Sequence, residues 1–170
     1  MRDIDAMRLF VSRFYAGLAF AAGGFTACIS APALAAEPIA LSEATDLAEA
    51  ALAECRIAGY PASVSVVDDH GIVRVVLRDD GAAKTPVAAP LKAATAVAFD
   101  QAGSDMEARE KTDPAFAALI AAHHDTYNDH PGSLPLHRDG ALVGGLAIAD
   151  VPHDVADGCV RAALARSPFR

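Results

Sequence analysis

The chain has 170 residues, of which 14 are Lys or Arg and 22 are Asp or Glu, giving a formal net charge of −8. This length is typical of a single domain with a sizeable core. The sequence has no stripe of clustered basic residues, which phosphate contacts require, so its charge argues against nucleic-acid binding. An acidic balance of this kind is an ordinary means of keeping a chain soluble.

Residues 1–35 are expected to be a secretory signal peptide that is cleaved off. Arg2, Arg8 and Arg13 give a basic start, an apolar run without charge covers 14–29, and Ala33-Leu34-Ala35 matches the A-x-A cleavage pattern. The apolar run of about 16 residues is shorter than the ~20 that span a membrane, and a retained anchor is the alternative. We therefore expect a periplasmic or secreted protein with no stable membrane anchor after cleavage.

Residues 36–40 are expected to form a linker, and residues 41–167 one folded domain. The domain begins with a predicted helix at 41–58, because apolar residues recur there at helical spacing and acidic residues occupy its first half. Ser42 is a good N-cap residue, and Gly59-Tyr60-Pro61 stops the helix.

A β-hairpin is expected next, with strands at 62–68 and 72–79. Serine and valine alternate over 63–66, and the second strand alternates apolar and basic residues, which predicts one buried face. Gly71 lies where the turn requires a positive φ, a conformation that glycine adopts without steric cost.

Three helical segments follow the hairpin. The first, at 90–99, begins with a proline, which fits the first turn of a helix. The second is a short charged helical turn at 105–111. Asp113 caps the third, with Pro114 at its first position, and the apolar face of this helix extends to His123.

The last third of the chain contains a polar loop at 124–132, strands at 134–137 and 142–149, and a helix at 154–166. Pro135 places its strand at a sheet edge, because proline cannot donate in a central ladder. Gly144 and Gly145 imply the close approach of a helix or a ligand. Two hairpins separated by helices do not make a doubly wound parallel sheet, and they predict an α+β domain with a mainly antiparallel sheet.

Two cysteines, Cys55 and Cys159, remain after the predicted signal peptide is removed. An exported compartment permits a disulfide between them. Each cysteine lies on a predicted helix, so a disulfide requires these two helices to touch. Buried free thiols are the more ordinary interpretation.

Four short motifs occur in order along the predicted domain. They are Val66-Val67-Asp68-x-x-Gly71, Arg78-x-Asp80-Gly81-Ala82, Lys92-Ala93-x-Thr95-Ala96-x-x-Phe99, and the stretch from Leu134-Pro135-Leu136 through Asp139-Gly140-x-Leu142-Val143-Gly144-x-Leu146-Ala147-Ile148. Together they resemble the GlcG/HbpS-like family, which includes haem-binding secreted proteins and the C-terminal domain of PduO-type proteins. The resemblance covers residues 41–166.

The resemblance implies a profilin-like α/β/α sandwich with an antiparallel sheet of about five strands, usually assembled into homo-oligomers. It also implies that haem or a related tetrapyrrole binds in some members, whereas others have no established ligand. The chain departs from the family pattern at 130–133, where members often carry a Gly-Gly pair and a longer Gly-rich loop.

Histidines are the most informative side chains for a binding site. His123 lies on an apolar helical face and fits an axial haem ligand, which needs a neutral imidazole in an apolar slot; His124 and His130 are further candidates. A histidine at a helix C-terminus that favours the helix dipole is the alternative for His123. The same three histidines, with Asp125 and Asp129, are also a candidate Zn²⁺ or Cu²⁺ site, although their spacing matches no strong signature and a solvated loop is the alternative.

Two further residues have a candidate role. Lys92 matches the lysine of the family's second helix, and it is expected to pair either with a ligand carboxylate such as a haem propionate or with Asp79 or Asp80. His70 lies in the first hairpin turn, where local hydrogen bonding and therefore a structural role are expected.

The function that these observations favour is an exported protein that binds a small molecule, haem or a related tetrapyrrole. The sequence contains no nucleophile with its base, no Gly-rich phosphate loop and no paired catalytic carboxylates, so no catalytic machinery is evident. Three alternatives stay open: a structural or partner-binding subunit of an oligomer, a divalent-metal-binding protein, and an enzyme that degrades haem.

Overall fold

The computed structural model describes residues 37–170, so the predicted signal peptide lies outside the described residues. The elements in chain order are α1 (Leu41–Ile57), β1 (Ser63–Asp68), β2 (Val73–Arg78), α2 (Ala88–Phe99), α3 (Gly103–Glu110), α4 (Pro114–Ala122), β3 (Ser133–Arg138), β4 (Ala141–Ala149) and α5 (His153–Ala165). Among residues 37–170, no helix has the combined length and hydrophobicity that a bilayer span requires.

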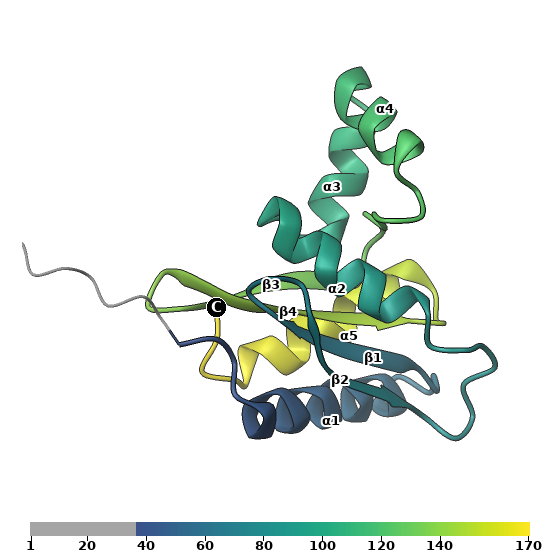
Figure 1. Cartoon of the computed structure of the whole chain (residues 1–170). Helices are drawn as coiled ribbons and strands as arrows, with labels where there is room; N and C mark the ends of the chain where they lie inside the picture. The colour runs from purple at the N-terminus through teal and green to yellow at the C-terminus, as the bar shows by residue number, and fades with distance from the viewer. Residues whose placement is uncertain (1–36) are drawn as a thin grey trace, which may run out of the picture. The chain divides into compact units, whose positions relative to one another are not determined.

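The four described strands form one antiparallel sheet in the order β2-β1-β4-β3. Helices α1 and α5 lie against one face of the sheet and against each other, and α2 lies on the opposite face (Figure 1). The expected α+β class and the three-layer α/β/α arrangement are therefore confirmed. The strand count differs from the expected five. The segment before α1 forms a backbone hydrogen bond from Ile39 N–H to the Val143 carbonyl, at 3.0 Å, but no strand.

The two hairpins have the turns that the sequence predicts. Gly71 has a φ of +75°, as expected for the first hairpin. Asp139 and Gly140 connect β3 to β4 with φ values of +52° and +83°, which suits a two-residue turn that matches the twist of the strands. Strand β3 lies at the sheet edge, in agreement with the prediction from Pro135.

The expectation that only one face of the first hairpin is buried is wrong for β1. Ser63 and Ser65 are completely buried, as are the valines that alternate with them. The reason is that β1 is a central strand, and α2 covers the face on which its serines lie. The alternation of serine and valine therefore distinguishes two faces that are both covered by helices. It does not distinguish a buried face from a solvent-exposed one.

The close approach predicted at the glycine pair is that of a helix. A Cβ atom placed on Gly145 would lie 2.6 Å from the Ala93 carbonyl oxygen of α2, and one on Gly144 would lie 2.4 Å from the Val67 carbonyl oxygen of β1. Real Cβ atoms do not come so close to backbone atoms, so glycine is what lets α2 rest directly on β4.

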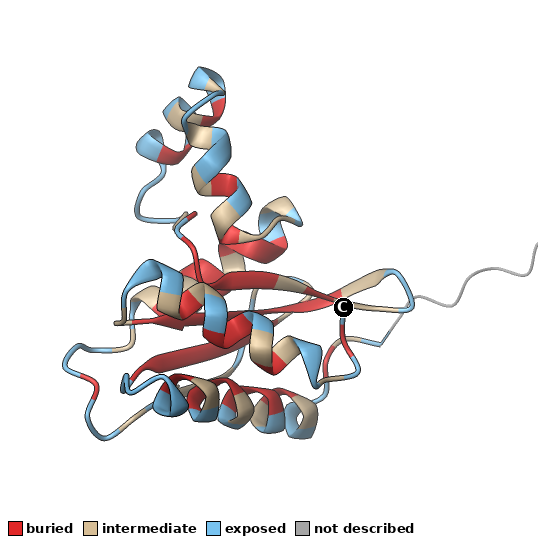
Figure 2. Ribbon diagram, turned by 180° about the vertical axis from the view of Figure 1, so that it is seen from behind, coloured by how far each residue is buried: buried red, intermediate tan, exposed pale blue. Residues whose placement is uncertain are grey.

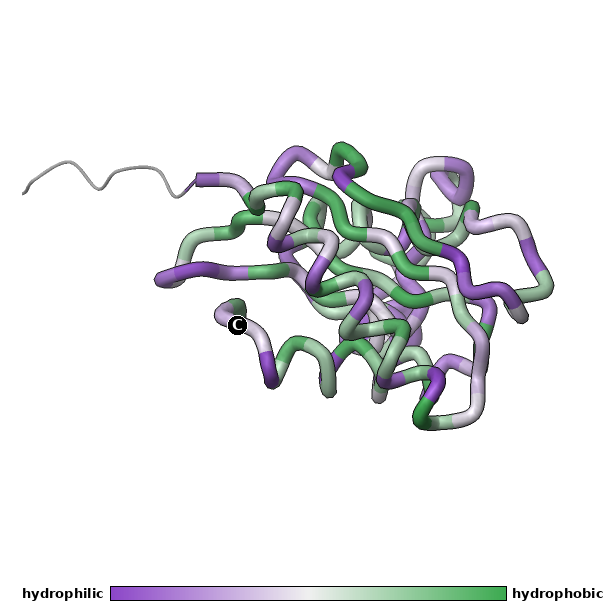
Figure 3. Tube along the Cα trace, turned by 90° about the horizontal axis from the view of Figure 1, so that it is seen from below, coloured by the Kyte–Doolittle hydropathy of each residue, from purple (hydrophilic) through white to green (hydrophobic). Residues whose placement is uncertain are grey.

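Most buried apolar side chains lie between the sheet and the pair of helices α1 and α5. This larger core contains residues from both helices, from β1, β3 and β4, and from Phe169 near the C-terminus. A much smaller cluster lies between the sheet and α2, formed by Val67, Ala93, Val97 and Ala147. Figure 2 shows the buried residues along the strands and on the helix sides that face them, and Figure 3 shows hydrophobic and hydrophilic residues alternating along the helices.

Cys55 of α1 and Cys159 of α5 form a disulfide bond. Free thiols, the more ordinary interpretation of the sequence, are therefore incorrect. The sequence could not decide between the two because the bond depends on the contact between α1 and α5, which are separated by the entire sheet in chain order.

Helices α3 and α4 form a helical arm (residues 103–122) that stands away from the sheet on the α2 side (Figure 1). Met106, Phe116 and Ile120 form its small core, against which Phe99 and Tyr127 pack. Asp113 accepts hydrogen bonds from the backbone N–H groups of Ala115 and Phe116, both at 3.1 Å, which confirms it as the cap of α4.

Candidate functional site

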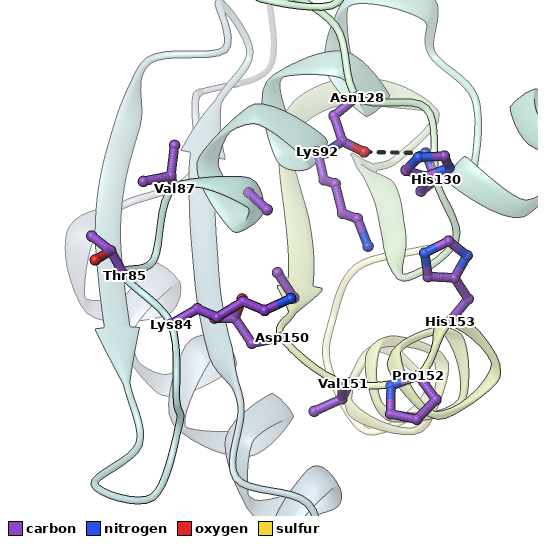
Figure 4. A pocket seen from close by; sticks show the side chains of 12 residues that line it. Lys84, Thr85, Val87, Lys92, Asn128, His130, Asp150, Val151, Pro152 and His153 are labelled. Atoms are coloured by element: carbon purple, nitrogen blue, oxygen red, sulfur yellow. Dashed lines mark hydrogen bonds between the residues drawn. The ribbon is translucent and has the colours of Figure 1, made fainter.

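A cavity of about 490 Å³ lies where the start of α2, the end of β4 and the start of α5 meet. Apolar walls come from Val87, Val151 and neighbouring small residues, and polar side chains come from Lys92, His130 and His153 (Figure 4). The cavity lies within the usual size range of small-molecule sites. Its lining is more polar than usual, because Lys84, Thr85, Asn128 and Asp150 also line it.

Lys92 is the buried basic side chain of this site, with only 4% of its surface exposed. Its Nζ donates to the carbonyl oxygens of Pro131, at 2.8 Å, and Ile148, at 3.4 Å. Burial lowers the pKa of Lys92 to about 8, and the carboxylates of Asp150 and Glu107 oppose this effect. The amine therefore joins the loop before β3 to the end of β4.

The ion pair of Lys92 with Asp79 or Asp80, one of the two expectations for this lysine, is not formed. Asp79 instead pairs with Arg56 of α1, whose Nε lies 2.8 Å from a carboxylate oxygen. The Arg56 guanidinium holds the pKa of the Asp79 carboxyl below its usual value. Lys92 could not reach this pair because its side chain extends between α2 and the loop before β3, where it donates to carbonyls.

His130 and His153 lie side by side on one wall of the cavity (Figure 4). Their ring centroids are 4.9 Å apart. The Nδ1 atoms of His130 and His153 lie 3.6 Å and 3.4 Å, respectively, from the same carboxylate oxygen of Glu107. The structure thus brings together three potential ligand side chains from α3, the loop before β3 and the first residue of α5.

Two carboxyl groups, those of Asp129 and Glu110, lie near His130. Asp129 is buried, with 3% exposure, and its Oδ2 has no hydrogen-bond partner among the described residues. Burial and the neighbouring Asp129 raise the pKa of Glu110. Protonation of Glu110 is therefore favoured beside the Asp129 carboxylate.

His123 and His124 lie at the C-terminal end of α4, and both are exposed. The expectation that His123 faces a buried apolar slot is therefore wrong: its ring contacts Tyr127 at a centroid distance of 6.0 Å, outside the cavity. The α4 helix carries both histidines away from the sheet, whereas the loop after it brings Asn128 and His130 back to the cavity. Whether His123 or His124 binds a ligand stays a prediction.

The structure assembles a different ligand group from the one that the sequence indicated. Among residues 37–170, His130 groups with Glu107 and His153, and not with His123 and His124. Glu107 belongs to a charged helix and His153 begins a helix, so neither attracts notice in the sequence. Their position in space was the missing information.

The first hairpin turn has the structural role expected of it. Asp68 Oδ1 accepts hydrogen bonds from the backbone N–H groups of His70, at 3.0 Å, and Ile72, at 2.9 Å. His70 Nδ1 lies 2.9 Å from Asp69 Oδ1, which raises the pKa of His70. These polar groups therefore already have hydrogen-bond partners within the turn.

The family model described as "Haem degrading protein HbpS-like" matches residues 39–165. The chain belongs to this family. The resemblance found in the short motifs is therefore confirmed. No curated protein matches the chain significantly.

Several solved structures have the same fold. The crystal structure of a PduOC–haem complex has a TM-score of 0.71 and 26% identity, over 78% of this chain and 97% of that one. A double mutant of HbpS from Streptomyces reticuli has a TM-score of 0.68 and 29% identity, over 88% of this chain and 96% of that one. ORFY from Klebsiella pneumoniae, at 18% identity over 79% of this chain and 94% of that one, shares the fold with a TM-score of 0.69.

Proposed function

We propose that this HbpS-like chain is an exported haem-binding protein that uses the cavity between α2, β4 and α5. The observation that carries the proposal is the similarity to PduOC, a protein crystallised with haem, over almost all of that chain. Haem, when bound, supplies an iron with an open coordination position and two carboxylates. A haem site therefore needs a ligand for the iron and a cation for the carboxylates.

The side chains of the cavity fit these two requirements. The imidazoles of His130 and His153 are nitrogen donors of the kind that haem iron accepts, and they share the cavity lining with the apolar residues Val87 and Val151. The Lys92 amine is a cation for a propionate group. A carboxylate beside this amine favours its charged form, so binding would raise the pKa of Lys92 from about 8 again.

Two observations support export. The sequence before residue 36 has the pattern of a signal peptide. The disulfide between Cys55 and Cys159 is typical of oxidising compartments outside the cytoplasm. Mass spectrometry of the protein from the periplasm or medium of expressing cells tests this part of the proposal. The expected first residue of the exported chain is Ala36. An uncleaved chain in the cytoplasmic fraction would contradict export.

A homo-oligomer is the second part of the proposal. All nine residues of α4 are apolar, but only Phe116 and Ile120 are buried, and Leu119 is 39% exposed. A helix that is apolar on all sides normally lies within a core, so a second copy of the chain is a suitable cover. Sedimentation of Leu119→Asp beside the natural chain tests this: the variant is expected to sediment as the smaller species, and equal sedimentation would overturn the idea.

Haem binding is tested by titrating the full chain with haemin in the presence of a metal chelator, with the Soret band as the signal. A saturable shift at one haemin per chain is expected. No shift at micromolar protein would overturn the proposal.

Haem degradation is the second candidate function, which the description of the family favours. Loss of the Soret band after addition of a reductant and O₂, at a rate above that of free haemin, would support degradation over binding alone.

A further inference from the structure

The three side chains of the Glu107, His130 and His153 cluster converge from separate parts of the fold. They come from α3, the loop before β3 and the start of α5. Their side chains are between 30% and 50% exposed, so solvent and ions can reach them. A convergence of two imidazoles and a carboxylate is the ligand set that Zn²⁺ takes in open, three-ligand protein sites.

The spacing of the donor atoms matches a metal site better than hydrogen bonding. The separations of 3.6 Å and 3.4 Å between the histidine Nδ1 atoms and the Glu107 oxygen are longer than usual N–H···O hydrogen bonds. Donors placed 2.0–2.1 Å from a tetrahedral ion lie roughly 3.3–3.5 Å from one another. All three donor atoms lie within 4.8 Å of each other. Small side-chain movements would thus place all three around one ion.

The surroundings of the cluster favour a cation. Asp129, Asp150 and Asp157 each have a buried carboxylate oxygen without a hydrogen-bond partner in the described structure. Asp129 adjoins His130 in the chain, and the charges of Asp150 and Asp157 act on Lys92, as does that of Glu107. Lys92 is the one buried basic side chain among residues 37–170, and it carries at most a single positive charge. Arg161 pairs with the other carboxylate oxygen of Asp157, at 2.6 Å, and Lys111 Nζ lies 3.7 Å from the other oxygen of Glu107. The carboxylates that a divalent ion would balance are therefore those of Asp129 and Asp150.

We propose that Glu107, His130 and His153 bind a divalent transition-metal ion of the Zn²⁺ class, with a fourth coordination position open to the cavity. The site goes beyond haem binding and does not depend on it. His130 would take part in both, so the metal site belongs to the haem-free protein. The ion would bind a carboxylate or water in the cavity through its open position.

The other described cluster of potential ligands does not support a similar proposal. Asp68, Asp69 and His70 also lie within reach of one ion. Their oxygen and nitrogen atoms, however, already form hydrogen bonds within the hairpin turn. His70 is therefore a suitable control in the experiment below.

The test is calorimetric titration of the haem-free full chain, purified without a polyhistidine tag, with Zn²⁺. One ion per chain with micromolar or tighter affinity is expected. His153→Ala and Glu107→Gln are each expected to weaken binding by more than about 100-fold, beyond the 10–100-fold typical of losing a group behind a ligand. His70→Ala and the double variant His123→Ala, His124→Ala are expected to bind as the natural chain does.

Three results would overturn the proposal: no binding by the natural chain, unchanged binding by His153→Ala and Glu107→Gln, or loss of binding in the His123, His124 double variant. The last would place the metal on the loop that the sequence indicated. Because the replaced side chains are partly exposed, all variants are expected to fold, and their circular dichroism checks this. Glu107→Gln also separates the two proposals, because it should lose Zn²⁺ binding but retain the haemin-induced Soret shift.

Discussion

The two faces of the sheet differ in what they bury. The face that α1 and α5 cover buries a large apolar cluster and a disulfide bond. The face that α2 covers buries a cluster of four small or medium apolar residues. The buried polar residues Ser63, Ser65 and Lys92 lie on or beside this second face, and the cavity opens at its end.

We infer from this difference that the α1–α5 face mainly stabilises the fold and that the α2 face provides the binding site. A large apolar core and a covalent link between α1 and α5 hold the sheet in place from one side. The other face can therefore keep a buried amine, unpartnered carboxylate oxygens and a cavity, all of which cost stability. Three changes, one on the first face and two on the second, test this division of roles.

The largest effect is expected from removing the disulfide on the α1–α5 face. Replacing both Cys55 and Cys159 by alanine opens a loop of 104 residues, and the loss of this constraint on the unfolded chain corresponds to about 4–5 kcal/mol. The free energy of unfolding, measured with urea, gives this value. Reducing the natural chain with dithiothreitol should cause a loss of similar size, and a loss below about 1 kcal/mol in both would contradict the role given to this face.

A smaller effect, dependent on pH, is expected at Lys92 on the α2 face. Burial lowers the pKa of Lys92 from 10.5 to about 8, so the unfolded chain binds a proton that the folded chain has released between these values. Stability should therefore rise from pH 8 to pH 10.5, by at most about 3 kcal/mol from this group. Below pH 8 both states are protonated, and the cost of burying the charge is present in full.

The matched variants Lys92→Met and Lys84→Met make this prediction specific. Both lysines line the cavity, but Lys84 is exposed. Urea unfolding across this pH range should show the rise in the natural chain and in Lys84→Met, and not in Lys92→Met. The same slope in all three proteins would show that Lys92 keeps an ordinary pKa.

The smallest of the three effects is expected where α2 rests on β4. A Cβ atom on Gly145 would meet the Ala93 carbonyl oxygen and Val97 Cγ2, at 2.6 Å and 2.8 Å, so Gly145→Ala must move α2 away from the sheet. Overpacking of this kind costs about 1–3 kcal/mol. Gly140→Ala serves as a comparison without contacts, since nothing lies within 4 Å of its Cβ position, although its positive φ carries a cost of its own. Thermal unfolding that is unaffected by Gly145→Ala would contradict the close contact.

Local signals in the sequence were sufficient for much of the fold. The alternation at 63–66, the Asp-Gly turn at 139–140 and the Asp113-Pro114 start of α4 each act within a few residues, and all three predict the observed elements. The burial of both faces of β1 was not predictable in this way. It depends on α2, which covers β1 while resting on the neighbouring strand β4 at Gly145, far along the chain.

The candidate site was predicted less well than the fold, because it depends on tertiary contacts. Lys92 and His130 were identified, and they line the same cavity. Glu107 and His153 were missed because no spacing in the sequence relates them to His130. His123 was favoured because its helix is apolar, but α4 belongs to the helical arm, where an apolar side chain can be exposed. An apolar helix does not by itself indicate a buried slot.

Haem binding in the cavity on the α2 face is best tested by a haemin titration of two double variants. We expect His130→Ala with His153→Ala to abolish the saturable Soret shift, and His123→Ala with His124→Ala to leave it unchanged. The reverse result would place the iron ligand on the helical arm and contradict the claim.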